Sequence, residues 1–189
     1  MIFKNNYLNL NSYQKKYLSK IKELELSEPF FPWKNRTAVN MEGMFACGWT
    51  NDNLILMVCY DGYIITNPLG EIIEENKDIS PYELMSKDNL EFKVQNRNEN
   101  IKIFGLYGGN GNLVSSEGWK LEIIYPSWPN SFVVLKRPRK KNETLSVWEG
   151  IKLLALKEQE YTNLKCGFSI NEKHFLISGS NGVEIFSKE

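Results

Sequence analysis

The chain has 189 residues, of which 42% are hydrophobic and 13% aromatic, so it can bury one substantial core. Lysine plus arginine and aspartate plus glutamate both number 23, and this balance excludes a global field that would favour nucleic acid or an acidic membrane. We therefore expect a single domain over 1–189, no nucleic-acid partner, and electrostatic contacts only through a local patch.

The three cysteines indicate a reducing compartment. Cys47, Cys59 and Cys166 are an odd number and lie far apart in sequence, which suits buried thiols better than a disulfide framework. No window approaches the roughly 20 apolar residues of a membrane span, and the first residues lack the apolar segment of a signal peptide. The sequence therefore predicts a soluble, cytoplasmic protein.

Residues 12–26 carry the clearest helical pattern, with Ser12 as a possible cap and apolar side chains at helical spacing. The following segment, PFFPW, ends this helical extension. Its aromatic residues Phe30, Phe31 and Trp33 either pack against one end of a sheet or form an exposed anchor for a partner. Core packing is the simpler interpretation, and the three residues are also candidate partner contacts.

Residues 45–75 predict a four-strand antiparallel meander, and residues 166–186 repeat much of its pattern. Each stretch starts with Cys-Gly-aromatic-hydroxyl, passes through a polar turn and an apolar run, and reaches Asp61-Gly62 or Asn181-Gly182. These dipeptides predict two-residue type I′ hairpin loops, which need a positive φ at both central positions. The second stretch is therefore interpreted as a structural echo of the first.

The region between the two stretches mixes a polar crossing with alternating strands. Residues 76–100 are polar and irregular, with one helical turn predicted at 80–85 because proline is favoured at the first helical position. The segment 145–161 fits either a helix or a buried strand, and we favour a strand over 150–156. Further strands and one glycine-rich turn are predicted at these positions: 101–106, 108–112 (the turn), 119–123 and 132–135.

Chemistry-bearing residues do not converge in sequence. The glycine cluster at 105–111 matches no phosphate-binding motif and predicts a hairpin turn. His174 is the only histidine and begins an apparent strand, while the cysteines are too isolated for a zinc site. Carboxylates lie at turns or on alternating strand positions: Asp52, Asp61, Glu71, Glu74 and Glu75. We assign no catalytic, cofactor-binding or metal-binding residue and expect a protein that is not an enzyme.

One local patch is strongly basic. Five of the six residues at 136–141 are cationic, and Pro138 holds the run extended. Such a run either is a solvated loop or binds an acidic protein face, phosphoinositide head groups or nuclear import factors. The candidate partner contacts in it are Lys136, Arg137, Arg139, Lys140 and Lys141.

Several landmarks follow one another in chain order. They are CGWT at 47–50 with YDG at 60–62, VQNR at 94–97 before IKIF at 101–104, RPRK at 137–140 before VWE at 147–149, and NGVEIFS at 181–187. Their order resembles the N-terminal propeller region of vacuolar protein sorting protein sixteen, a core subunit of the HOPS and CORVET tethering complexes. The resemblance covers about two thirds of the chain.

The resemblance implies an all-β, β-propeller-like fold of antiparallel meanders with a short N-terminal helix. At about 40 to 45 residues per blade, the length allows about four blades or an incomplete propeller, whose exposed edges would have to be covered, charged or paired. It also implies a non-enzymatic protein-interaction scaffold for vesicle tethering and protein transport. Its partners would be other subunits and acidic endosome or vacuole membranes contacted peripherally.

Two other function classes fit the same residues. A small free-standing binder, such as a bacterial immunity-type protein that blocks a toxin, would be equally compact and free of catalytic motifs. An enzyme would need a pocket that brings His174 together with two carboxylates.

Overall fold

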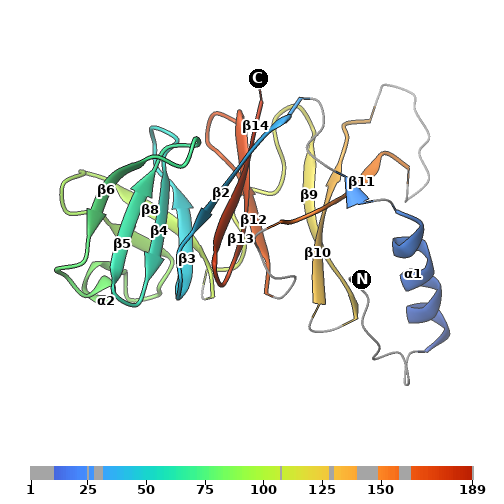
Figure 1. The fold of residues 1–189 in the computed structure, drawn as a ribbon, viewed down its shortest axis with the longest axis horizontal. Helices are drawn as coiled ribbons and strands as arrows, with labels where there is room; N and C mark the ends of the chain where they lie inside the picture. Colours follow the sequence, from blue (N-terminus) through green and yellow to red (C-terminus); the bar gives the residue numbers. More distant parts are fainter. Residues whose placement is uncertain are drawn as a thin grey trace.

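The computed structural model describes residues 11–24, 26–27, 32–106, 108–127, 130–139, 149–157 and 163–188. Strands in these residues form three sheets that lie side by side along the long axis of the molecule, with helix α1 outside the last of them (Figure 1). Apart from one two-residue strand, neighbouring strands run antiparallel. The prediction of an all-β fold with a short N-terminal helix is therefore confirmed.

The first sheet, which we call the curled sheet, has the strand order β6-β5-β4-β3-β8-β7. It contains the predicted four-strand meander, and the predicted strand at 101–106 adds to its other side. The sheet curls, and this brings the ring of Tyr63 on β5 to 5.3 Å from that of Phe92 on β7, measured between centroids. Its strands are β3 (Met44–Trp49), β4 (Ile55–Cys59), β5 (Gly62–Thr66), β6 (Ile72–Asn76), β7 (Glu91–Lys93) and β8 (Asn100–Gly105).

The middle sheet has the order β12-β13-β14-β2 and joins distant parts of the chain. The predicted repeat of the meander supplies its last three strands in sequence, and β2 pairs with β14 over six residues. Residues 35–40 were not predicted as a strand. The strands are β2 (Asn35–Asn40), β12 (Lys165–Phe168), β13 (His174–Gly179) and β14 (Gly182–Ser187).

The third sheet, which we call the outer sheet, has the order β1-β11-β10-β9 and carries α1 on its outer face. Ile21 of α1 packs there against Phe132 and Val134. The helix ends at Glu23, so the predicted end at 26 is wrong: Leu26 instead begins β1, which runs parallel to β11. The elements are α1 (Ser12–Glu23), β1 (Leu26–Ser27), β9 (Lys120–Ser127), β10 (Asn130–Lys136) and β11 (Ile151–Leu154); α2 (Pro81–Leu84) is the predicted helical turn.

Two apolar clusters hold the three sheets together. Side chains alternate along β14, so that Val183 and Ile185 pack with the curled sheet while Phe186 packs with the outer sheet. Cys47 contributes to the first cluster and Cys166 to the second, and both thiols are fully buried. The middle sheet therefore contributes to an apolar cluster on each of its faces, as expected of a central layer.

The glycine-rich segment connects the curled sheet to the middle sheet. Gly105 and Gly109 form an antiparallel bridge, which confirms the predicted turn. Gly111 then lies against β12, where its N–H donates to the oxygen of Cys166 at 3.0 Å. A side chain at Gly111 would come within 3.1 Å of Gly167. Close backbone approach, rather than ligand binding, accounts for this glycine.

The two predicted hairpins exist, but their turn type is different. Cys59 pairs with Gly62, so the loop residues are Tyr60 and Asp61, and neither has a positive φ. The type I′ prediction is therefore wrong. Gly62 is needed for another reason: its φ is +144° and a Cβ there would lie 2.1 Å from the backbone oxygen of Asn76. Gly182 approaches Val39 in the same way.

In the described residues, one hydrogen-bonded turn occurs four times, at Thr50, Ser86, Ser115 and Ser169. In each, the hydroxyl oxygen accepts from the N–H of a residue four or five positions later, whose carbonyl accepts from the N–H of the hydroxyl residue. The residue three positions after the hydroxyl has a positive φ each time: Asn53, Asn89, Gly118 and Glu172. The predicted echo between the two stretches is thus confirmed and extends to two further places.

Candidate functional site

The basic run begins at the end of β10. Lys136 Nζ lies 2.5 Å from Glu122 on β9, so this charge is compensated within the outer sheet. Arg137 is partly buried and its side chain crosses Gly150, where a Cβ would come within 2.8 Å of it. Arg139 is exposed, and Lys140 and Lys141 lie outside the described residues. The structure thus leaves Arg139 as the cation of this run that points to solvent within the described chain.

Of the aromatic candidates, Trp33 alone lies in the described residues. Trp33 is 1% exposed and packs between the middle and outer sheets, 4.9 Å from Trp119 and 5.4 Å from Phe175 between ring centroids. Core packing, the simpler interpretation from the sequence, is therefore confirmed for Trp33, and the alternative of an exposed anchor is wrong for this residue. Phe30 and Phe31 lie outside the described residues.

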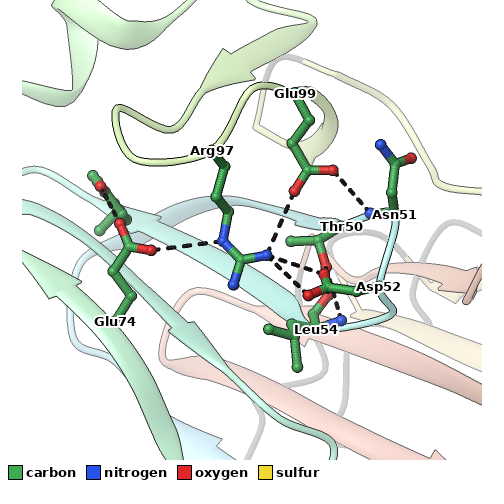
Figure 2. A network of polar contacts seen from close by, with 8 residues as sticks. Thr50, Asn51, Asp52, Leu54, Glu74, Arg97 and Glu99 are labelled. Carbon is green, nitrogen blue, oxygen red and sulfur yellow. Dashed lines mark hydrogen bonds and ion pairs between the residues drawn. The ribbon is translucent and has the colours of Figure 1, made fainter.

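A polar network that sequence reasoning missed is centred on Arg97 (Figure 2). Its guanidinium lies 3.1 Å from both carboxylate oxygens of Asp52, 3.6 Å from Glu74 and 3.7 Å from Glu99. Glu74 lies on β6 and Arg97 in the loop between β7 and β8, so one side chain joins the two edge strands of the curled sheet. The arginine thereby holds the edge strand β6 close to the loop that follows the other edge strand, β7.

Hydrogen bonds orient the carboxylates of this network. Glu74 accepts from the hydroxyl of Tyr63 at 2.8 Å, and burial together with this contact raises the pKa of Tyr63 to about 12. Burial tends to raise the pKa of Asp52, but hydrogen bonds from Thr50 and Arg97 hold it below its ordinary value. Three carboxylates therefore share one cation, and each also accepts a hydrogen bond: Asp52 from Thr50, Glu74 from Tyr63 and Glu99 from the N–H of Asn51. This arrangement stabilises loops and offers no unpaired acid and base for catalysis.

The remaining titratable candidates are packed individually. His174 stacks on Trp49 with 6.1 Å between centroids, and its Nδ1 lies 2.8 Å from the Ser187 hydroxyl. Burial raises the pKa of Cys47 and of Cys166 to about 12 each. Within the described part of the chain, no set of His, Cys, Asp and Glu side chains could hold a metal ion.

In the described part of the chain, two of the clefts lie between the curled sheet and the middle sheet. The larger, of about 790 Å³, has Trp49, Phe104 and Phe168 at its base and Asn100 and Asn112 in its walls. The smaller, of about 290 Å³, lies beside Tyr60 and Leu106 and reaches Lys165 and Ser178. Both are lined by side chains from sheets that are distant in sequence, which is why no local motif marks them.

Comparison of the chain with protein-family models, with curated proteins and with solved structures finds no match. The strand pairings define the class as an all-β protein of antiparallel sheets that lie side by side. None of the helices in the described ranges combines the length and apolarity needed to cross a bilayer.

Proposed function

We propose that the chain is a non-enzymatic protein-interaction scaffold built from four blade-like units. The four hydroxyl turns support this division, because each separates an initial short segment from the next antiparallel strand. Units would then begin near residues 44, 85, 113 and 165. Four units agree with the chain length, which allows about four blades.

The pairing of β2 with β14 also supports blade-like units. A strand from early in the chain completes the sheet formed by the last strands, which is one way in which repeat proteins fix their ends. In this structure the units at 44 and 85 share the curled sheet through the pairing of β3 with β8. The proposal therefore concerns the repeat and not a closed ring.

The observation that carries the scaffold proposal is that apolar packing and internal ion pairs hold the sheets and loops in fixed positions. Two apolar clusters fix the sheets, and the charge networks around Arg97 and Glu184 join elements of the described chain to one another. Loops on such a rigid body are suited to recognition. From the resemblance to the tethering subunits, we propose partner subunits and acidic membranes of endosomes or vacuoles as the surfaces that are bound.

The test is charge reversal at Arg139, Lys140 and Lys141, which leaves the structural contacts of Lys136 and Arg137 in place. A matched control reverses three exposed lysines elsewhere, Lys15, Lys16 and Lys87. Binding is measured by pull-down with recombinant HOPS and CORVET core subunits and by flotation with liposomes that contain acidic lipid. The proposal expects loss in the first variant alone, while unchanged binding of both variants contradicts it.

A further inference from the structure

The larger cleft between the curled and middle sheets has a rigid, apolar floor. Its volume of about 790 Å³ lies within the range of small-molecule binding sites. Trp49, Phe104 and Phe168 form the floor and are 8%, 4% and 2% exposed. The indole N–H of Trp49 donates to the oxygen of Gly167 at 3.2 Å, and its ring stacks on His174. Because this polar group is already bonded, the floor offers apolar contact to a ligand.

Two asparagines in the wall of the cleft have a fixed orientation. Oδ1 of Asn110 accepts the N–H of Cys166 at 3.2 Å, and Oδ1 of Asn112 accepts the N–H of Val114 at 3.4 Å. A backbone N–H is a donor only, so each contact identifies the oxygen end of the carboxamide and leaves its NH2 group to donate. The wall therefore contains two preset hydrogen-bond donors.

Two further asparagines in the wall, Asn51 and Asn100, are exposed. Asn51 contacts Glu99 through its backbone N–H, while its carboxamide takes no part in the Arg97 network (Figure 2). Neither carboxamide makes a hydrogen bond with another described residue. A carboxamide both donates and accepts, so these two side chains can bind a hydroxyl group in either direction.

The charges in the wall favour a ligand that is not an anion. Among the described lining residues, Asp88 and Glu91 are acidic and Lys102 is basic. Glu91 lies opposite Lys102 in the pairing of β7 with β8, so these two charges offset each other. Asp88 accepts from the Ser86 hydroxyl at 2.6 Å and from the N–H of Leu90 at 3.2 Å. The remaining acidic charge disfavours phosphate and nucleic acid, while carboxylates accept hydrogen bonds from hydroxyl groups.

The strand edges beside the cleft are already occupied. The N–H of Phe168 on β12 donates to the oxygen of Asn112 at 2.8 Å, and Met85 forms a bridge to Phe92 on β7. A peptide therefore cannot add to either edge as a further strand at these positions. The burial of the three floor rings also hides the faces on which a nucleobase would stack. Recognition in this cleft thus depends on the side chains of its wall.

We propose that the larger cleft binds a neutral oligosaccharide. The C–H faces of a sugar ring can pack on the apolar floor and on the side chains of Leu90 and Ile170, which line the cleft and are 44% and 60% exposed. Sugar hydroxyl groups both donate and accept, which matches a wall that combines preset donors, acidic acceptors and two-way carboxamides. The site shares no residue with the basic run at 136–141 and does not depend on the scaffold function.

The test probes the protein with an array of neutral trisaccharides built from glucose, galactose, mannose or N-acetylglucosamine, together with their sulfated counterparts. The neutral trisaccharide that binds best is then titrated by calorimetry at low and at high salt. The cleft variant combines Asn51→Ala with Asn100→Ala. The matched control combines Asn96→Ala with Asn98→Ala, which removes two exposed carboxamides outside the cleft. Circular dichroism establishes that each variant is folded.

We expect a neutral trisaccharide to bind with an affinity that salt does not change, because an uncharged ligand has no charge to screen. Each lost hydrogen bond lowers the affinity, so the cleft variant should bind at least about tenfold more weakly and the control normally. Binding of sulfated sugars alone, binding of no sugar on the array, or equal loss in both variants overturns the proposal. A variant reversed at Arg139, Lys140 and Lys141 should bind the trisaccharide as the wild type does, so this proposal and the scaffold proposal fail separately.

Discussion

Arg36 on β2 and Glu184 on β14 form an ion pair in the interior, where 9% of the arginine side chain and none of the glutamate is exposed. Glu184 also accepts the backbone N–H of Lys157, which follows β11, at 2.8 Å. The Arg36 guanidinium lies 5.5 Å from the ring centroid of Phe186. One carboxylate therefore connects two strands of the middle sheet with the outer sheet.

Removing one partner of this pair should be severely destabilising. In Glu184→Gln the largely buried arginine loses the charge of Glu184, and we expect the free energy of unfolding to fall by about 3–5 kcal/mol. Urea denaturation measures this loss. Glu23→Gln, which breaks the exposed pair with Lys20, is the control and should change stability by less than about 0.5 kcal/mol. A similar small change for both variants would show that the buried pair is not needed.

The Arg97 network predicts a pH-dependent defect. In Arg97→Ala the carboxylates of Asp52, Glu74 and Glu99 face one another without a cation, so stability should fall most at neutral pH. The depressed pKa of Asp52 contributes stability above about pH 4, and this is lost as pH falls through the folded pKa. The difference between wild type and variant should therefore shrink on acidification. Urea unfolding at several pH values measures it, and a constant difference would contradict the explanation.

His174 predicts a second pH effect of defined sign. Burial, and then the neighbouring Lys173, lower its pKa below the ordinary value. Between that lowered pKa and about 6.5 the unfolded chain binds a proton that the folded protein does not, so stability falls as pH drops through this window. NMR titration of the only histidine gives the pKa, and His174→Asn should flatten the stability profile there. An NMR pKa at or above about 6.5 would refute this prediction.

Gly182 and Gly109 form a matched pair for backbone strain. Both have a positive φ, but a Cβ at Gly182 would lie 2.1 Å from the oxygen of Val39, whereas nothing lies within 4 Å at Gly109. We expect Gly109→Ala to cost about 1 kcal/mol and Gly182→Ala at least about twice as much, because β2 must shift. Thermal unfolding compares them. Equal costs would mean that β2 adapts without loss.

The sequence was sufficient where the controlling interactions are local. Alternating apolar residues predicted the meander at 45–75 and its echo, and helical spacing predicted α1. The predicted turn type was wrong because Gly62 is required by the close backbone of Asn76 on the next strand. A two-residue motif does not report this contact. Similarly, β7 is too short to show alternation, and β2 carries few apolar side chains and exists through its pairing with β14.

The candidate sites depend even more on non-local contacts. The sequence showed the positive charge of the run at 136–141. It did not show that Glu122 on the neighbouring strand compensates Lys136. Trp33 looked like a possible anchor because its aromatic partners at 119, 168 and 175 are distant in the chain. The Arg97 network joins residues from two loops, β3–β4 and β7–β8, with Glu74 on β6. A hydroxyl residue followed two positions later by Asp or Asn, as at Thr50, Ser86 and Ser169, was a local signal that could have located the repeated turn.

The pairing of β2 with β14 has a consequence for synthesis on the ribosome. The curled sheet uses the contiguous residues 44–105, so it can form while later segments are still being translated. Residues 35–40 must wait for 182–187 to emerge before they find their partner. During elongation, the nascent chain thus carries an early strand with no neighbour, which a chaperone would have to shield from pairing incorrectly.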